Sequence, residues 1–142
     1  MTPLEGLHVL RKLAVYQPQM PRDDMTVDAW AEALAPYDYR DGLDAVTKLG
    51  LEPRPAGETW LVELRHVKAE IDSTRRRRFD LRRPMLPDPP HEVADDPAAY
   101  KAWWGQVATA AMARDWTPPP AIEGTRSGES VVASLLAKLS RT

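Results

Sequence analysis

The chain has 142 residues, which is enough for one ordinary domain or a small domain with a tail, since domains usually run to about 100 to 200 residues. Apolar residues make up 43% and charged residues 28%, and 19 basic against 21 acidic side chains leave a net charge of −2, which favours neither a polyanion-coating protein nor an acidic tail protein. The absence of cysteine excludes a disulfide scaffold, a thiolate zinc site and a cysteine nucleophile.

The prolines and the charges divide the chain near Arg83. Eight of the 14 prolines lie between residues 84 and 120, and proline both interrupts helices and stiffens linkers. Residues 1–64 carry a net charge of −5, residues 65–83 of +5 and residues 84–142 of −2, so the near-neutral total conceals a basic segment. We therefore expect a folded first part and a tail.

Two helix starts are recognisable near the N-terminus. A threonine cap followed three residues later by a glutamate forms a capping box, which predicts a helix from Pro3 to about Gln17. A second start at Thr26 opens a helix that carries Trp30 on its inner face and ends at Pro36.

Two more helices complete the first part. Asp38 is a suitable cap for a third helix, and Gly50 is a natural left-handed residue just after its end. The longest helical pattern runs from about Leu61 to Leu81, with an apolar stripe that includes Ile71. No stretch alternates with period two for long enough to predict a strand.

The tail contains a helical pattern at about residues 96–115. Asp95 or Asp96 as cap and Pro97 at the first position open it. Its apolar side chains share one face: Tyr100, Trp103, Trp104, Val107 and Ala111. Such a face favours packing on the core or on a partner. Stacking on nucleic-acid bases is the alternative.

A second pattern, at about residues 129–140, is a double apolar stripe: Val131, Val132, Leu135, Leu136 and Leu139. An amphipathic segment at the end of a proline- and glycine-bearing linker is typical of a helix that binds in the groove of a partner and is disordered when free. The alternative is a helix that folds back on its own domain.

The predicted fold class is all-α. Residues 1–83 are expected to form a small four-helix domain that ends in an arginine-rich helix. Residues 84–142 are expected to be a proline-rich, partly disordered C-terminal region that carries one or two further helices.

The strongest local signal is a run of arginines at the end of the fourth predicted helix: Arg75, Arg76, Arg77, Arg78, Arg82 and Arg83. Guanidinium groups make bidentate contacts with phosphates and carboxylates, so this run predicts binding of nucleic acid or of an acidic partner surface. The alternative is a solvated face, on which the cations complement the helix dipole and Arg76 pairs with Asp72 and Asp80.

Catalysis, metal binding and membrane insertion are not predicted. His8, His66 and His91 lie in three separate segments, and no glycine-rich phosphate loop occurs, so we expect no enzyme, no metal site and no cofactor. No apolar run approaches the roughly 18 residues of a membrane span, and the N-terminus is unlike a signal peptide, so we expect a cytoplasmic protein without a membrane partner.

Four segments together resemble the N-terminal domain of the phage replicative-helicase loader and inhibitor proteins: residues 10–16 (LRKLAVY), 25–34 (MTVDAWAEAL), 39–46 (YRDGLDAV) and 60–67 (WLVELRHV). In that family a hydroxyl-capped helix with a tryptophan precedes a tyrosine-led helix, and the last helix begins near an acidic residue and runs into basic residues. The matching places here are held by Thr26, Trp30, Tyr39, Glu63 and the arginines after Arg65.

The resemblance implies a protein that binds the hexameric replicative helicase, as loader, inhibitor or both, in phage DNA replication in the cytoplasm of the host cell. It implies no chemistry of its own. A phage origin-binding initiator and DNA are further candidate partners. We expect the terminal stripe to contact the helicase and the arginines to contact DNA or the initiator.

Two other functions fit the residues. A small helical nucleic-acid-binding protein or regulator would contact phosphate through Arg75–Arg78, and its affinity would fall steeply with salt. A phage inhibitor of another host protein would use the same helical surfaces.

Overall fold

The computed structural model describes residues 1–21, 23–53 and 61–118. Over these ranges the chain is all-helical, with six α-helices, one short 3-10 helix and no strand, in agreement with the predicted fold class. The helix predicted at about residues 129–140 lies outside the described residues.

The first helix, α1 (Pro3–Tyr16), begins at the predicted capping box. The Glu5 amide donates to the Thr2 hydroxyl oxygen at 3.3 Å, and the Thr2 amide donates to the Glu5 carboxylate at 2.7 Å. These reciprocal bonds satisfy backbone donors that the first turn of a helix leaves free.

The second helix, α2 (Asp24–Leu34), begins before the predicted start, because its cap is Asp23 and not Thr26. The Asp23 carboxylate accepts from the Thr26 amide at 3.0 Å and from the Thr26 hydroxyl at 2.8 Å. An aspartate three residues upstream therefore takes the capping role that the sequence analysis gave to the threonine.

The third helix, α3 (Tyr39–Leu51), has the predicted Asp38 cap, whose carboxylate accepts from the Arg40 amide at 2.8 Å. The prediction for Gly50 is wrong, because this glycine lies inside the helix. A Cβ atom there would lie 2.4 Å from the ring of Tyr16, so a close approach between α1 and α3 accounts for the missing side chain.

The fourth helix, α4 (Leu64–Arg82), begins three residues later than predicted. Val62 precedes it outside any helix and is buried, and its amide donates to the Gln17 side-chain oxygen at 3.0 Å. This long-range bond fixes where the chain enters α4.

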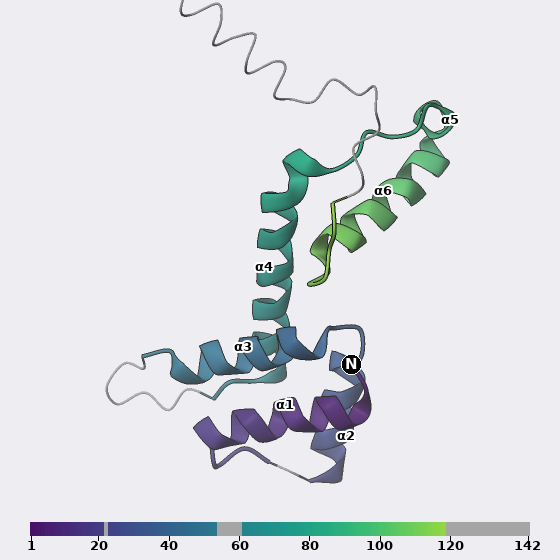
Figure 1. The fold of residues 1–142 in the computed structure, drawn as a ribbon. Coiled ribbons are helices and arrows are strands. Elements are labelled where there is room, and N and C mark those ends of the chain that lie inside the picture. The colour runs from purple at the N-terminus through teal and green to yellow at the C-terminus, as the bar shows by residue number, and fades with distance from the viewer. Residues whose placement is uncertain (22, 54–60, 119–142) are drawn as a thin grey trace, which may run out of the picture.

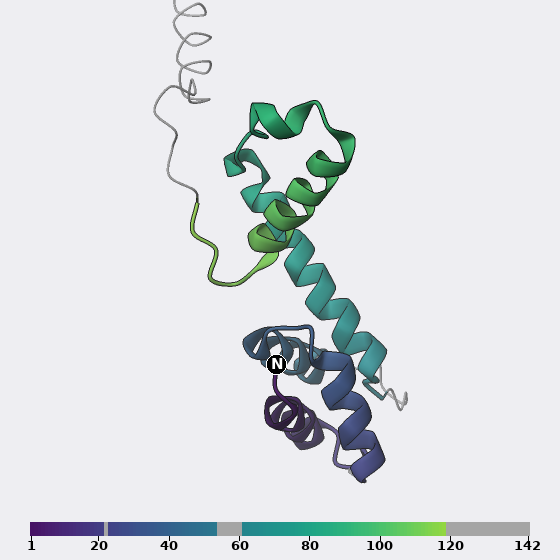
Figure 2. The same ribbon diagram turned by 90° about the vertical axis from the view of Figure 1, so that its right-hand side faces the viewer.

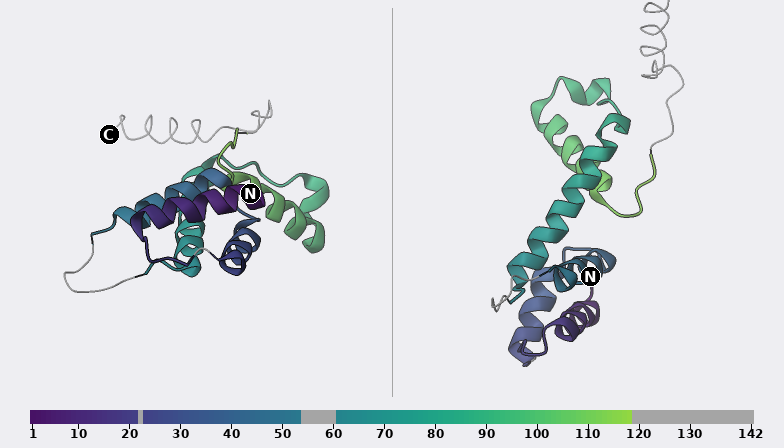
Figure 3. Two further views of the ribbon diagram at one scale, coloured as in Figure 1. Left: turned by 90° about the horizontal axis from the view of Figure 1, so that it is seen from below. Right: turned by 90° about the vertical axis from the view of Figure 1, so that its left-hand side faces the viewer.

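The first half of α4 completes one hydrophobic core with α1, α2 and α3. Its buried members come from all four helices and from the segment before α4: Val9, Leu10, Leu13, Trp30, Leu34, Ala45, Val46, Leu49, Val62, Val67 and Ile71. α1 packs against both α2 and α3, and Figure 3 shows it lying beside α3.

The second half of α4 extends away from this core and supports the rest of the described chain (Figures 1 and 2). After a short 3-10 helix (Arg83–Met85) and the four-residue α5 (His91–Ala94), neither of which was predicted, α6 (Pro97–Met112) returns beside α4. Of the two aspartates that could cap α6, Asp95 and Asp96, the structure shows that Asp96 does so, since its carboxylate accepts from the Ala98 amide at 2.9 Å.

The aromatic face of α6 is turned only in part toward α4. Trp104 meets Phe79 edge to face, with ring centroids 6.2 Å apart, and Ala111 is buried. Tyr100, near the start of α6, is 41% exposed. Packing on α4 is therefore a use of this face within the chain itself.

Candidate binding surface on the arginine helix

Helical periodicity divides the arginine run into two faces. Arg75, Arg78 and Arg82 continue the spacing of the apolar stripe that includes Val67 and Ile71, so they lie on the face that α4 turns toward the other helices. The remaining three arginines, which we call the outer arginines, are exposed to solvent: Arg76, Arg77 and Arg83.

Arg78 forms a two-pronged ion pair with Asp41 of α3. Its Nη1 donates to Asp41 Oδ2 at 2.8 Å, and its Nη2 donates to Asp41 Oδ1. The Asp41 side chain is only 3% exposed and that of Arg78 17%, so water screens the pair weakly. The contact joins α3 to the second half of α4.

Arg114, just after α6, completes the network. Its Nε lies 3.4 Å from Asp41 Oδ1, and its Nη2 pairs with Asp44 on the next turn of α3. Burial alone would raise the pKa of Asp41, but the hydrogen bonds and the charge of Arg78, with a further contribution from Arg114, hold it below its ordinary value. Asp41 therefore stays ionised as the acceptor of two cations.

Arg82 caps the C-terminal end of α6. Its Nη1 donates to the carbonyl oxygen of Ala111 at 2.8 Å and also to that of Ala113, and its guanidinium lies 5.2 Å from the Trp116 ring centroid. The last turn of α6 has no basic residue of its own, so a cation from α4 satisfies carbonyls that a helix end leaves free.

Arg75 contacts Tyr37, which packs against the hydrophobic core. Its guanidinium lies 5.5 Å from the ring centroid of Tyr37, and the Tyr37 hydroxyl donates to Asp72 at 3.3 Å. Burial, together with the negative charge of Asp72, raises the pKa of Tyr37.

The outer arginines differ from these three in their contacts. Across the described ranges no ion pair joins Arg76, Arg77 or Arg83 to a carboxylate, and Arg76 does not pair with Asp72 or Asp80 as the solvated-face alternative supposed. Their guanidinium groups are therefore the part of the run that remains available to a phosphate or to a carboxylate of another molecule.

The carboxylates that receive this run were not predicted from the sequence. Asp41 lies in the first turn of α3, where an acidic side chain also favours the helix dipole, and neither it nor Arg114 was predicted to pair with the run. A signal was present on the arginine side, because positions 75, 78 and 82 extend the stripe of Val67 and Ile71. Nothing in the sequence pairs Asp41 with Arg78, which is 37 positions away, or with Arg114, which is 73 positions away.

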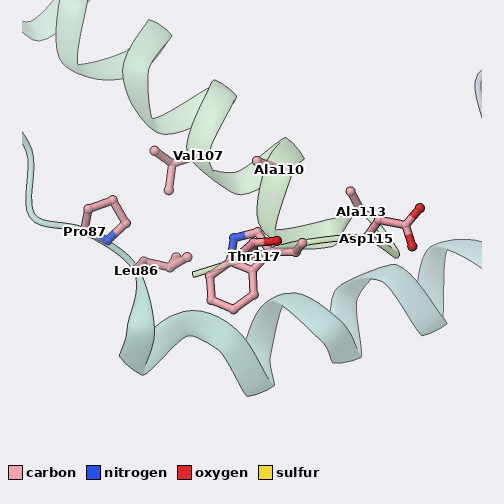
Figure 4. Close-up of a pocket in the computed structure, with 8 residues that line it drawn as sticks. Leu86, Pro87, Val107, Ala110, Ala113, Asp115 and Thr117 are labelled. Carbon is pink, nitrogen blue, oxygen red and sulfur yellow. The ribbon is translucent and has the colours of Figure 1, made fainter. Parts of the chain in front are cut away.

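Two hollows lie beside these contacts. A largely apolar pocket of about 480 Å³ separates the chain after α4 from α6 and is closed on one side by the segment after α6; it is lined by Leu86, Pro87, Val107, Ala110, Ala113, Asp115, Trp116 and Thr117 (Figure 4). A more polar cleft of about 240 Å³ lies at the α3–α4–α6 junction and includes Asp38, Asp41, Arg75 and Arg114.

Two kinds of feature are absent from the described residues. Among them no three histidine or acidic side chains are grouped so that they could hold a metal ion. None of the helices in the described ranges is both long and apolar enough to cross a membrane. The predicted partner-binding stripe, residues 131–139, lies outside the described residues.

Comparison with known proteins returns no relative. No protein-family model, no curated protein and no solved structure matches the chain. A function therefore has to be argued from the residues and from their geometry.

Proposed function

We propose that the chain is a binding protein of phage DNA replication that engages the hexameric replicative helicase as loader, inhibitor or both. The observation that supports this proposal is that the four segments of the resemblance fold together. Each contributes at least one side chain to the same buried core, as with Leu10, Trp30, Val46 and Val67.

The proposed division of labour follows from which side chains are free. The core residues are buried against one another. Three of the six arginines, Arg75, Arg78 and Arg82, make contacts within the chain. The outer arginines remain for DNA or for a phage initiator. The apolar stripe at residues 131–139 is assigned to the helicase.

Affinity capture from cells in which the phage genome is replicating tests the proposal. A tagged full-length chain is expected to retain the replicative helicase, and a chain that lacks residues 122–142 is expected to lose it. Capture of a different host protein in place of the helicase would favour the inhibitor of another host protein. Undiminished helicase capture by the shortened chain would refute the assignment of the tail.

Nucleic-acid binding is the second candidate, and the exposed outer arginines, which pair with no carboxylate in the described ranges, favour it. Replacing Arg76, Arg77 and Arg83 by alanine is then expected to weaken binding to a DNA duplex or single strand and to reduce the salt slope by about 2 to 3. Replacing the exposed Arg11, Arg40 and Lys101, which lie on α1, α3 and α6, is the control matched in charge. Equal affinities for all variants, or no binding at low salt, would remove this candidate.

A further inference from the structure

We propose that the apolar pocket beside α6 is the intramolecular docking site of the chain's own terminal stripe, residues 131–139. This docking would involve the chain alone and does not depend on the proposed function.

The pocket has the size and the lining of a binding site. Its volume of about 480 Å³ lies within the range of about 300 to 1,000 Å³ that is usual for sites that enclose a ligand. Its walls are mostly aliphatic and aromatic, with Leu86 and Pro87 on one side and Val107 and Ala110 of α6 opposite them (Figure 4). Trp116 also lines it. An occupant would therefore present aliphatic side chains.

The chain itself leads into this pocket. Trp116 and Thr117 line it, and the described residues end at Pro118, directly after them. The guanidinium of Arg82 lies 5.2 Å from the Trp116 ring centroid and so holds the exit of the chain against α4. Whatever follows Pro118 is tethered at the rim.

The sequence after Pro118 has the matching chemistry and enough length. Twelve residues, 119–130, precede the first valine of the stripe and can span up to about 40 Å, so the stripe can reach a pocket at its own tether. A tether of this length gives an effective concentration on the order of millimolar. Docking then needs only a weak intrinsic affinity.

The stripe also needs a surface. Residues 129–140 are at the lower limit of about 12 to 15 residues for a helix in water, so a helix there requires apolar contact. Lys138 and Arg141 adjoin its last leucine, and Asp115 lines the pocket, so the charges near the contact are of opposite sign. A partner that binds the stripe must displace it from this pocket, which lowers the partner's apparent affinity.

Paramagnetic relaxation measured on the full chain tests this docking. The chain has no cysteine, so Ser134→Cys provides a single attachment point for a nitroxide on the side of the segment opposite the stripe. Amide signals of Leu86, Val107 and Ala110 are expected to lose more than half of their intensity, and those of Gly6 in α1 are expected to be unchanged. Undiminished signals around the pocket would overturn the proposal.

Two matched pairs of variants identify the contact. In the nitroxide-labelled chain, the double variant Leu135→Asp/Leu139→Asp is expected to restore the amide intensities around the pocket. The double variant Ser130→Asp/Ala137→Asp adds the same charge outside the stripe and is expected to leave them reduced. In the pocket wall, Ala110→Lys is expected to restore them and the exposed Ala102→Lys is not.

Broadening that persists in the double-leucine variant would contradict the proposal. So would broadening seen only when nitroxide-bearing chains act on separate isotope-labelled chains, because the occupant would then be a second copy. Neither result would bear on helicase capture, so the inference and the proposed function can fail separately.

Discussion

Asp41 is the residue through which distant parts of the chain meet. It is buried in α3, and it accepts hydrogen bonds from Arg78 of α4 and from Arg114 after α6. Two guanidinium groups compensate the cost of burying its charge. Removal of the carboxylate would leave Arg78 without its carboxylate partner and Arg114 with Asp44 alone.

Replacing Asp41 by asparagine is expected to lower the free energy of unfolding by about 2 to 4 kcal/mol, because the amide keeps the size and loses the charge. Urea denaturation measures the change. Asp44→Asn is the matched control: the Asp44 side chain is 66% exposed and contacts Arg114 alone among the described cations, so its loss is expected to cost less than about 1 kcal/mol. Equal costs at the two positions would show that Asp41 has no special role.

The same carboxylate predicts how stability depends on pH. The folded pKa of Asp41 is lowered from 3.8, so its contribution is present above that value and is lost as the pH falls through the folded pKa. The difference in free energy of unfolding between the native chain and Asp41→Asn is therefore expected to shrink steadily from about pH 5 downward. A difference that stays constant between about pH 5 and pH 2 would contradict this.

Contacts within one helical turn could be predicted from the sequence, and long-range contacts could not. The Thr2–Glu5 capping box and the Asp38 and Asp96 caps were predictable, because each depends on residues within one helical turn. The pairing of Arg78 with Asp41 was not predictable, since the two residues are 37 positions apart and only the folded chain brings them together.

At the level of the elements, α4 has two separate roles. Its first half supplies Val67 and Ile71 to the core, and its second half carries α6 through Phe79 and through Arg82. The arginine spacing on α4 serves to hold α6 as well as to present charge to solvent.

Arg82→Gln is expected to loosen α6 and not the core. Losing charged hydrogen bonds to the end of α6 should cost about 1 to 2 kcal/mol, so amide exchange in α6 is expected to accelerate about 5- to 30-fold. Amides of α1 to α3 should keep their protection, and the exposed Arg83→Gln should change nothing. Equal acceleration in all helices would mean that the described chain opens as one unit.

Two helical glycines make opposite predictions. A Cβ atom added at Gly105 on α6 would meet no described atom within 4 Å, so Gly105→Ala is expected to raise the free energy of unfolding by about 0.5 to 1 kcal/mol. At Gly6 a Cβ would lie 3.0 Å from the Ala31 Cα of α2, so Gly6→Ala is expected to lower it by about 1 kcal/mol or more. Thermal unfolding compares them, and stabilisation by both would rule out the close α1–α2 crossing.

Periodicity located most of the elements and misplaced some of their ends. The apolar stripes predicted α1, α3 and α6 closely, because their caps are local. The start of α4 was placed three residues early, since the Val62 amide donates to Gln17, a residue 45 positions away, and Glu63, the cap of α4, is extended. The same limit concealed that α6 packs on α4.

For the whole molecule, the structure changes the meaning of the charge pattern. The basic segment at residues 65–83 has a net charge of +5, yet three of its six clustered arginines make contacts with other parts of the same chain. The outer arginines are what remains for a partner, and they are too few to make electrostatic attraction the whole basis of binding.

Light scattering after size exclusion of the purified full-length chain with a purified hexameric replicative helicase tests the proposed function most directly. We expect the mass of the helicase peak to rise by whole multiples of the 15.9 kDa chain, and to return to that of the hexamer when residues 122–142 are deleted. A helicase peak whose mass is unchanged by an excess of the full-length chain would contradict the proposed function.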